Sequence, residues 1–579
     1  MKLVTTALEE TLKFDNVENI YLGFWCKYNN SFNLLNKSNS SIFLEHHWLD
    51  NKKLYKDYKY LENLYEIALN QISKELNNKH STSYSNRYWR ILIGPWLAYF
   101  IHILYDRWET IQKALEQYSD LETDILEIPE LSLIPNDMQD FVNITTSDKW
   151  NHYIYSTILR NDVRIKKNYL VYEDKKVYLN NEGVISNYNY IHKLYSFLSK
   201  IFVKENDAFI IATYLPKFKE LLLQLKLLQF PQKWDRIREK KIKISGTRDW
   251  NINSDFGKTD FENYLCSMIP KQIPAVFLEG YNIINKSINN AGWPKKPKFI
   301  FTSNALLHDD LIMAYTAKNV EYGTKLICGQ HGGIYGIAKF SWAENHEIEI
   351  SDKYLTWGWN YENYNNFKLI PVGYFKEKFK NINSPKNTKL VIVCLESSRY
   401  TYRISSEVMA MVNHTDNCVL FVNNLQPSFY EHTSIRLSSI DYGWGQSKIW
   451  KQKFPNIEID LGIKKMGKIF TESKLIVYTY NSTGFLEAIV SDKPFIIFFD
   501  INKFTIRDSA ISYFELLKNV GIFHENPISA AKHVEKIWVN VFEWWNLDET
   551  RNALKIFSEK YCKTDKKVNK NIFNILKSL

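Results

Sequence analysis

Short apolar runs alternate with amphipathic stretches and polar turns along most of this chain, a pattern typical of an α/β protein. The clearest case lies in the middle, where residues 298–304 predict a strand, 311–322 a helix and 325–330 a second strand. Strand, helix and strand at this spacing form a βαβ unit, with parallel strands joined by a right-handed crossover. Both strands end in polar residues, and open α/β sheets bind ligands at that edge.

The same pattern restarts nearer the C-terminus. Residues 377–388 are charged and contain Asn and Pro without apolar periodicity, so we interpret them as an interdomain linker. Beyond the linker we predict strands that alternate with helices, at 389–395, 418–423, 457–460, 475–479 and 495–499. We therefore expect an α/β, GT-B-like fold, in which two Rossmann-like, doubly wound domains at 1–376 and 389–545 face a cleft.

The N-terminal domain is expected to carry a helical insertion at about residues 50–120. Opposite charges at helical spacing predict a helix over 50–80, and a second helix over 87–118 is interrupted at Gly94-Pro95, where proline kinks or restarts it. The remaining expectations are a first strand at 18–25, a loop or hairpin at 160–190, a strand and a helix within 205–228, and a C-terminal helix at 546–579 that returns to the N-terminal domain.

Composition narrows the class of protein and its partners. Hydrophobic residues make up 45% of the 579 positions, as in ordinary folded proteins. The net charge of +10 is scattered, which argues against nucleic acid and fits an anionic substrate or peripheral contact with an anionic membrane. Six cysteines without a C-x-x-C pair predict buried thiols in a reducing compartment. With no signal segment and no window of about 18 apolar residues, we expect a cytoplasmic protein, at most peripheral to the inner membrane.

The first candidate site is the turn Asn481-Ser482-Thr483-Gly484, between a predicted strand and a short helix. Small hydroxyl residues and glycine at the start of a helix form an anion site, because unpaired backbone N–H groups face the ligand. Glu487 lies one helical turn beyond Thr483, where its carboxylate can accept two hydrogen bonds from a ribose diol. We predict that this segment binds a nucleotide. A plain N-cap serine would explain one hydroxyl residue, but not the whole set.

The second candidate site is the bend Gln330-His331-Gly332-Gly333, which is expected to contact substrate. Its glycines allow backbone N–H groups to approach a ligand closely. His331 is predicted to act as general base toward an acceptor hydroxyl; the alternative is a histidine that hydrogen-bonds backbone and shapes the turn. Glu344, thirteen residues on, is expected either to orient His331 or to act alone as base or nucleophile, against the alternative of a surface charge.

Four further residues complete the predicted site. Ser397 and Arg399 follow a strand of the C-terminal domain and are expected to contact the donor nucleotide. Arg90 can bind a carboxylate bidentately or pack for structure, and Asn304 ends the first strand of the βαβ unit. No D-x-D motif stands at a strand end, so we expect no metal and no cofactor beyond a nucleotide-sugar substrate.

Several long segments of the chain are distinctive. They are LVTTALEET at 3–11, YWRILIGPW at 88–96, Asp106-Arg107, GQHGGIYG at 329–336, YLTWGW at 354–359 and residues 479–487. Nearly end to end, the chain resembles a family of transferases from bacterial surface-carbohydrate loci of the O-antigen or capsule type. The resemblance implies a GT-B glycosyltransferase, related in style to enzymes that use CMP-Kdo or CMP-linked nonulosonic acids. The paired short motifs of sialyltransferases are absent, since Gln426-Pro427 stands where those have His-Pro.

The leading hypothesis is a metal-independent glycosyltransferase that moves a nucleotide-activated sugar, a CMP-linked ulosonic or nonulosonic acid, onto a cell-surface glycan or a lipid-linked acceptor. Two alternatives stay open. One is a CDP-glycerol-type polyol-phosphate transferase, in which phosphate travels with the transferred group. The other is a non-catalytic carbohydrate-binding protein that keeps the fold without turnover.

Overall fold

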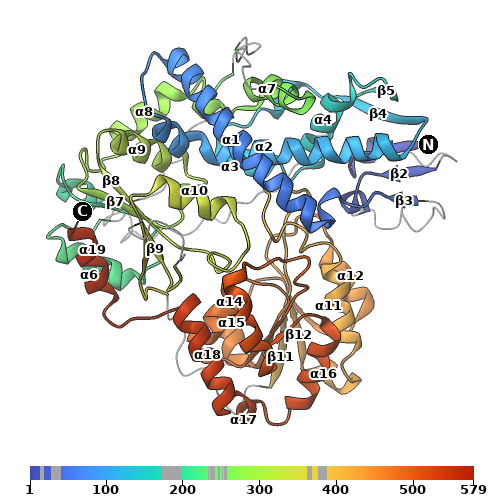
Figure 1. The fold of residues 1–579 in the computed structure, drawn as a ribbon, viewed down its shortest axis with the longest axis vertical. Coiled ribbons are helices and arrows are strands. Elements are labelled where there is room, and N and C mark those ends of the chain that lie inside the picture. The colour runs from blue at the N-terminus through green and yellow to red at the C-terminus, as the bar shows by residue number, and fades with distance from the viewer. Residues whose placement is uncertain are drawn as a thin grey trace.

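Three parallel β-sheets organise the protein (Figure 1). The computed structural model describes residues 1–12, 18–27, 41–172, 197–232, 234, 241–244, 248, 250, 252, 257–360, 368–375 and 388–578. The first sheet has the order β3-β2-β1-β4-β5, the second β10-β9-β8-β7-β6 and the third β13-β12-β11-β14-β15-β16. All strand pairs described in these sheets are parallel.

The strands are short. Those of the first sheet are β1 (Lys2–Val4), β2 (Asn19–Tyr21), β3 (Ser41–Phe43), β4 (Leu121–Glu127) and β5 (Ile165–Val171). Those of the second are β6 (Phe209–Ile210), β7 (Phe299–Thr302), β8 (Lys325–Gly329), β9 (Lys353–Thr356) and β10 (Leu369–Pro371). Those of the third are β11 (Lys389–Val393), β12 (Thr433–Arg436), β13 (Glu458–Asp460), β14 (Ser473–Tyr478), β15 (Phe495–Phe498) and β16 (Phe523–His524).

Two long helices, α1 (Asn51–His80) and α2 (Asn86–Gln117), form the predicted insertion between β3 and β4. Pro95 lies inside α2 without ending it. A Cβ at Gly94 would lie 2.7 Å from the Tyr65 hydroxyl, so glycine lets α1 pack closely on α2. The other helices considered below are α6 (Lys217–Lys226), α10 (Trp342–Ile350), α11 (His414–Asn423), α14 (Thr483–Val490), α16 (Pro527–Ile537), α18 (Asp548–Tyr561) and α19 (Val568–Lys577).

The α/β class with parallel sheets is confirmed, but the N-terminal region contains two sheets rather than one. Figure 1 shows the first sheet on the right, the second on the left and the third below them. The expected strand at 18–25 is β2 followed by a short helical turn, and β1 precedes it. The expected loop or hairpin at 160–190 contains β5, which pairs with β4, and the rest of it from residue 173 lies outside the described residues. The predicted linker at 377–388 also lies outside them, apart from residue 388.

The strand predicted at 418–423 is wrong, because these residues belong to helix α11. A short apolar run is compatible with either a strand or a buried helix. In the structure Cys418, Phe421 and Val422 are buried while Leu420 is exposed, which is helical spacing.

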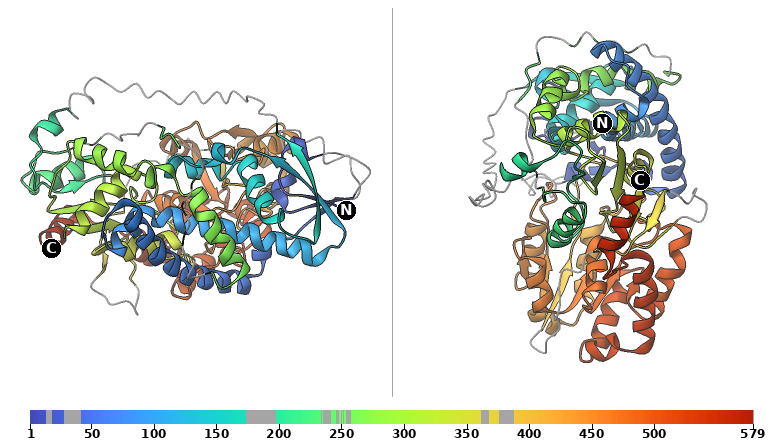
Figure 2. Two further views of the ribbon diagram at one scale, coloured as in Figure 1. Left: turned by 90° about the horizontal axis from the view of Figure 1, so that it is seen from above. Right: turned by 90° about the vertical axis from the view of Figure 1, so that its left-hand side faces the viewer.

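The chain returns to the second sheet after α18. The backbone N–H of Lys563 donates to Trp357 O at 2.9 Å, and that of Asp565 donates to Gly373 O at 2.7 Å. Helix α19 then lies beside α6, where Asn569 Nδ2 donates to Lys219 O at 2.8 Å. Both views of Figure 2 place the C-terminus among the elements of the second sheet.

The described residues settle two smaller expectations. All six cysteines are free and buried, as predicted. Of the helices in the described ranges, none combines the length and the apolar composition needed to cross a bilayer.

Candidate functional site

The two bends singled out in the sequence lie against each other. One follows β8 of the second sheet and the other follows β14 of the third, so both lie at the carboxyl ends of strands. The backbone N–H of Gly333 donates to Oγ1 of Thr483 at 2.9 Å. A Cβ at position 333 would lie 2.7 Å from both Cα and N of Thr483 and 2.8 Å from the carbonyl carbon of Ser482. Glycine therefore permits a backbone-to-backbone contact between the two sheets.

A crevice of about 470 Å³ opens at the carboxyl edge of the third sheet. Ser482 is the N-cap of α14, and its Oγ accepts from the N–H of Gly484 at 3.2 Å. The start of α14 lines the crevice, so the positive end of the helix dipole faces any anion bound there. Glu487 lines the same crevice one turn along α14 and is 6% exposed. The predicted nucleotide-binding residues Ser482, Thr483, Gly484 and Glu487 are thus together.

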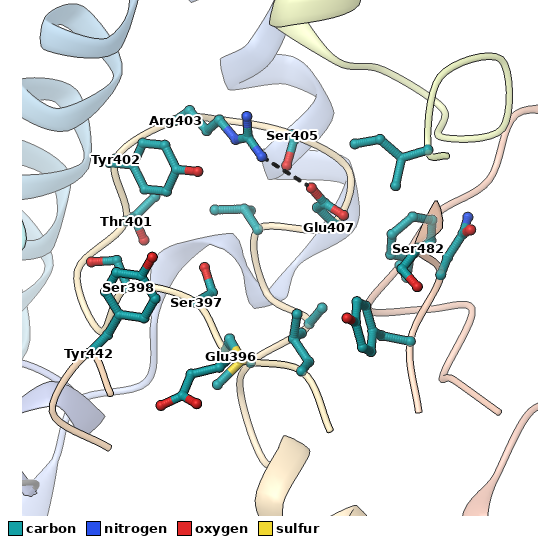
Figure 3. A pocket seen from close by; sticks show the side chains of 18 of the residues that line it. Glu396, Ser397, Ser398, Thr401, Tyr402, Arg403, Ser405, Glu407, Tyr442 and Ser482 are labelled. Atoms are coloured by element: carbon teal, nitrogen blue, oxygen red, sulfur yellow. Dashed lines mark ion pairs between the residues drawn. The ribbon is translucent and has the colours of Figure 1, made fainter. Parts of the chain in front are cut away.

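A second cavity, of about 390 Å³, adjoins the first (Figure 3). Its wall is built from Gly332 and Gly333 of the first bend, residues 395–411 after β11, and the turn before α14. Both cavities are lined by Glu396, Tyr480, Ser482 and Thr483, which therefore mark their boundary. A ligand in one cavity would meet a ligand in the other at this boundary.

The second cavity is rich in polar side chains. Figure 3 shows the hydroxyl groups of Ser397, Ser398 and Thr401 and the ion pair between Arg403 and Glu407, whose N–O distance is 3.6 Å. Asn481 also lines this cavity; it is 1% exposed, and neither of its amide atoms has a hydrogen-bond partner among the described residues. Hydroxyls, an amide and a guanidinium in one cavity are suited to a polar, hydroxylated ligand.

Glu396 lies at the boundary of the two cavities. Burial, reinforced by the nearby carboxylate of Asp441, raises the pKa of Glu396 to about 7. A carboxyl group with a pKa near neutrality can take up or release a proton at working pH.

His331 is hydrogen-bonded to a carboxylate, but the partner is Glu347 and not Glu344. The distance from Nε2 of His331 to Oε1 of Glu347 is 2.8 Å. The hydroxyls of Tyr335 and Tyr354 donate to the same carboxylate at 3.3 and 3.2 Å. Burial raises the pKa of Glu347, while His331 opposes the rise. The described residues that line the two cavities include Gly332 but not His331.

Glu344 is fully buried and serves a different contact. One carboxylate oxygen accepts from the N–H of Gly336 at 2.8 Å, and the other pairs with Arg507 at 3.1 Å. Glu344 and Glu347 are three residues apart on α10 and lie on neighbouring positions of one helical face. The sequence spacing could therefore identify the helix, but not which glutamate meets the histidine.

The structure does not bring three predicted substrate contacts to either cavity. Gln330 is buried and supports the bend: Oε1 accepts from Trp359 Nε1 at 2.7 Å, and Nε2 donates to Gly332 O at 2.9 Å. Arg90 binds Glu66 bidentately at 2.6 and 2.5 Å. Asn304 is exposed after β7 and lines neither cavity.

Arg399 and Ser397 line the second cavity and not the crevice at the start of α14. The guanidinium of Arg399 donates to Asp148 at 2.7 Å and to Trp25 O at 3.0 Å. These bonds join the third sheet to the first, so Arg399 holds the cavity wall in place instead of facing a nucleotide.

In the described part of the chain, three groups of side chains place metal-binding atoms within 4.8 Å of one another: Cys394, His414 and Cys418; His46, His47 and Asp106; and His47, Asp57 and Glu109. Nε2 of His414 already accepts from the N–H of Leu395 at 2.9 Å, and Asp106 pairs with Arg107. Neither contact favours a metal. Metal independence stays a prediction.

Parallel sheets in contact through their bends, with a crevice at the carboxyl edge of the third sheet, define an α/β protein of the class that binds ligands at that edge. The chain belongs to the LIC12162 family of transferases, since the family model described as LIC12162 family transferase matches residues 1–576. The protein is therefore a transferase. A comparison with curated proteins finds no match.

Solved structures give only distant likenesses. The wall teichoic acid polymerase TagF is 13% identical, with 52% of this chain and 83% of that chain covered and a TM-score of 0.29. MurG of Acinetobacter baumannii is 8% identical, with 67% and 96% covered and a TM-score of 0.31. The spinosyn rhamnosyltransferase SpnG is 9% identical, with 51% and 80% covered and a TM-score of 0.29. Likenesses this weak carry no conclusion about the present chain.

Proposed function

We propose that this transferase is a glycosyltransferase that moves a nucleotide-activated sugar, a CMP-linked ulosonic or nonulosonic acid, onto a surface glycan or a lipid-linked acceptor. The observation that carries the proposal is the shared boundary of the two cavities at Glu396, Tyr480, Ser482 and Thr483. The crevice beside α14 offers a phosphate site and a carboxylate for ribose. The second cavity offers hydroxyls and an amide for an acceptor sugar.

The donor is held by its leaving group. With the phosphate at the start of α14 and the ribose diol on Glu487, the anomeric carbon of the donor points toward the boundary of the cavities. The helix terminus and the hydroxyls of Ser482 and Thr483 then stabilise the negative charge that builds up on the departing phosphate. A nucleoside monophosphate leaving group needs no metal for this step, so the proposed enzyme is metal-independent.

Arg403 favours a sugar that carries a carboxylate. Its guanidinium lies on the wall of the second cavity, its side chain is 32% exposed, and its contact with Glu407 is long at 3.6 Å. A carboxylate of the sugar could form the shorter, bidentate pair that guanidinium groups prefer. This contact would hold the transferred sugar on the second-cavity side of the boundary.

His331 is the proposed general base, with Glu347 as the residue that positions it; His331 does not line either cavity itself but directly precedes Gly332, which lines the second. A neutral His331 that donates its Nε2–H to Glu347 keeps the lone pair of Nδ1 for the proton of the acceptor hydroxyl. The acceptor oxygen bonds to the anomeric carbon as the bond to the phosphate oxygen breaks, and the proton moves to Nδ1. General base catalysis of this kind contributes about 10²–10⁴ in rate.

The test is a transfer assay with purified protein, CMP-linked and CDP-linked donors, and a lipid-linked glycan. The proposal predicts release of CMP and a product that is heavier than the acceptor by one sugar residue and contains no more phosphorus than the acceptor. One additional phosphorus per transferred group, traced to the donor, would instead establish the CDP-glycerol-type transferase. Nucleotide binding without turnover by any donor would leave the proposed donor unsupported, and the absence of nucleotide binding would favour a carbohydrate-binding protein.

A further inference from the structure

Helix α6 exposes an apolar face. The relevant side chains are Phe218, Leu221, Leu225 and Leu228, whose exposed fractions are 69%, 37%, 48% and 87%. Phe218, Leu221 and Leu225 are three and four residues apart within α6 and so lie on one side of the helix, and Leu228 follows in the turn just after its end. Leu223 and Gln224, on the other side, are buried. We call these four exposed residues the α6 face.

The apolar surface continues onto the helical residues 197–202. There Phe197, Ile201 and Phe202 are 60%, 56% and 52% exposed. The ring of Phe202 lies 5.0 Å from that of Phe230, which closely follows α6, so the two helical segments are neighbours. Single exposed apolar residues are ordinary on protein surfaces, but seven within 32 residues of sequence are a patch that needs an occupant.

The segments that carry this surface are rich in lysine. Residues 197–228 and the adjoining 566–578 contain nine lysines and only three acidic residues. The lysines are Lys200, Lys204, Lys217, Lys219, Lys226, Lys566, Lys567, Lys570 and Lys577. Within the described ranges, no ion pair is recorded for the five lysines between 200 and 226, and four of these five are exposed. Helix α19 lies beside α6 and so brings its lysines to the same end of the molecule (Figure 1).

We propose that the α6 face and residues 197–202 dock the protein on an anionic lipid bilayer. Exposed Phe and Leu side chains enter the boundary between headgroups and acyl chains, and the surrounding lysines pair with anionic headgroups. A second copy of the chain is the less favourable occupant, because a two-fold interface would bring the same lysines against each other. The proposal rests on this surface alone and not on the proposed glycosyltransferase activity.

The test is sedimentation of the full-length protein with vesicles of phosphatidylcholine mixed with phosphatidylglycerol, and with vesicles of phosphatidylcholine alone. We expect binding to the mixed vesicles that weakens as salt rises, and little binding to the neutral ones. The variant Phe218→Glu/Leu225→Glu should lose binding by at least ten-fold. Lys217→Ala/Lys226→Ala should weaken it by about five-fold for each lysine.

Control variants with the same kinds of substitution elsewhere on the surface test whether vesicle binding depends on the α6 face. Val539 and Leu547 are 83% and 51% exposed on the third-sheet side of the molecule, so Val539→Glu/Leu547→Glu should bind vesicles as the parent does. Lys532→Ala/Lys536→Ala on α16 is the control for charge, since both lysines are exposed there. Equal loss in the control and α6 variants, or equal binding to neutral and anionic vesicles, would overturn the proposal. A different result would also overturn the proposal: the parent protein forms a dimer and does not bind vesicles, and among the variants only Phe218→Glu/Leu225→Glu dissociates that dimer. This result would assign the surface to a second copy of the chain.

Discussion

Gly333→Ala is the substitution that perturbs the contact between the two bends most directly. The added methyl group would lie 2.7 Å from Cα and N of Thr483 and 2.8 Å from the carbonyl carbon of Ser482. These are backbone atoms, so no side chain can turn away, and one bend must move by several tenths of an ångström. Overpacking of this kind costs about 1–3 kcal/mol. The hydrogen bond from Gly333 to Thr483 would weaken as well, at about 0.5–1.5 kcal/mol.

The neighbouring glycine provides the control. A Cβ at Gly332 would meet its nearest atom, on the ring of Tyr335, at 3.5 Å, which is ordinary van der Waals contact. We expect Gly333→Ala to lower kcat by about 10-fold to 100-fold, because a misplacement of about 1 Å costs about 100-fold and the bend moves by a large part of that distance. Gly332→Ala should stay within a few-fold of the parent. The assay is release of nucleotide from the donor, with thermal unfolding measured alongside. Equal activity of the two variants would refute the reasoning that the two bends form one site.

Four further predictions follow from the site and the core. His331→Ala should lower kcat by about 10²–10⁴-fold with little change in KM. Glu347→Gln should lower kcat by a smaller factor and shift the pH dependence of kcat. If the pH dependence of kcat is the same in Glu347→Gln as in the parent, Glu347 is not the residue that positions His331. Glu487→Ala should weaken nucleotide binding by about 10–100-fold. The substitution should reduce the affinity for 2′-deoxynucleotides less than the affinity for ribonucleotides. Calorimetric titration of the parent and the variant with both kinds of nucleotide measures this difference. Burial lowers the pKa of His102 and His346 to about 3. The unfolded chain therefore binds more protons between about pH 6.5 and pH 3, so stability should fall as pH drops through that window, by about 1.4 kcal/mol per pH unit for each histidine. Urea unfolding at several pH values checks this, and His346→Phe should reduce the slope. Dialysis against EDTA should leave transfer activity intact. A loss of transfer activity on dialysis that is reversed by adding Mg²⁺ would contradict metal independence.

The α/β class and many of the elements could be predicted from apolar periodicity. The strand–helix–strand unit at 298–330 and the helices at 50–80 and 87–118 are present because their patterns extend over enough residues to be distinctive. The sequence does not predict the first sheet as a separate sheet, because several of its strands are very short. β1, β2 and β3 have three residues each, which is too few for an alternating pattern to show.

The candidate site could be predicted where it depends on local structure. A hydroxyl-rich turn at a helix start and a glycine bend after a strand are local features, and the structure places them in contact at Gly333 and Thr483. Residues brought in by tertiary packing could not be inferred in the same way. Packing of helix α10 against the bend after β8 brings Glu347 to His331. The course of the loop after β11 brings Arg403 and Glu407 to the wall of the second cavity. Gln330 looked like a ligand-binding residue, but its amide holds the bend together.

The central claim is that the turn before α14 binds the phosphate of an activated donor. A crystal structure of the protein with CMP bound tests it most directly. We predict that the phosphate lies within hydrogen-bonding distance of the Thr483 backbone N–H and the Ser482 hydroxyl, with the ribose diol on the carboxylate of Glu487. CMP bound at another place, with the start of α14 left to solvent, would contradict the account.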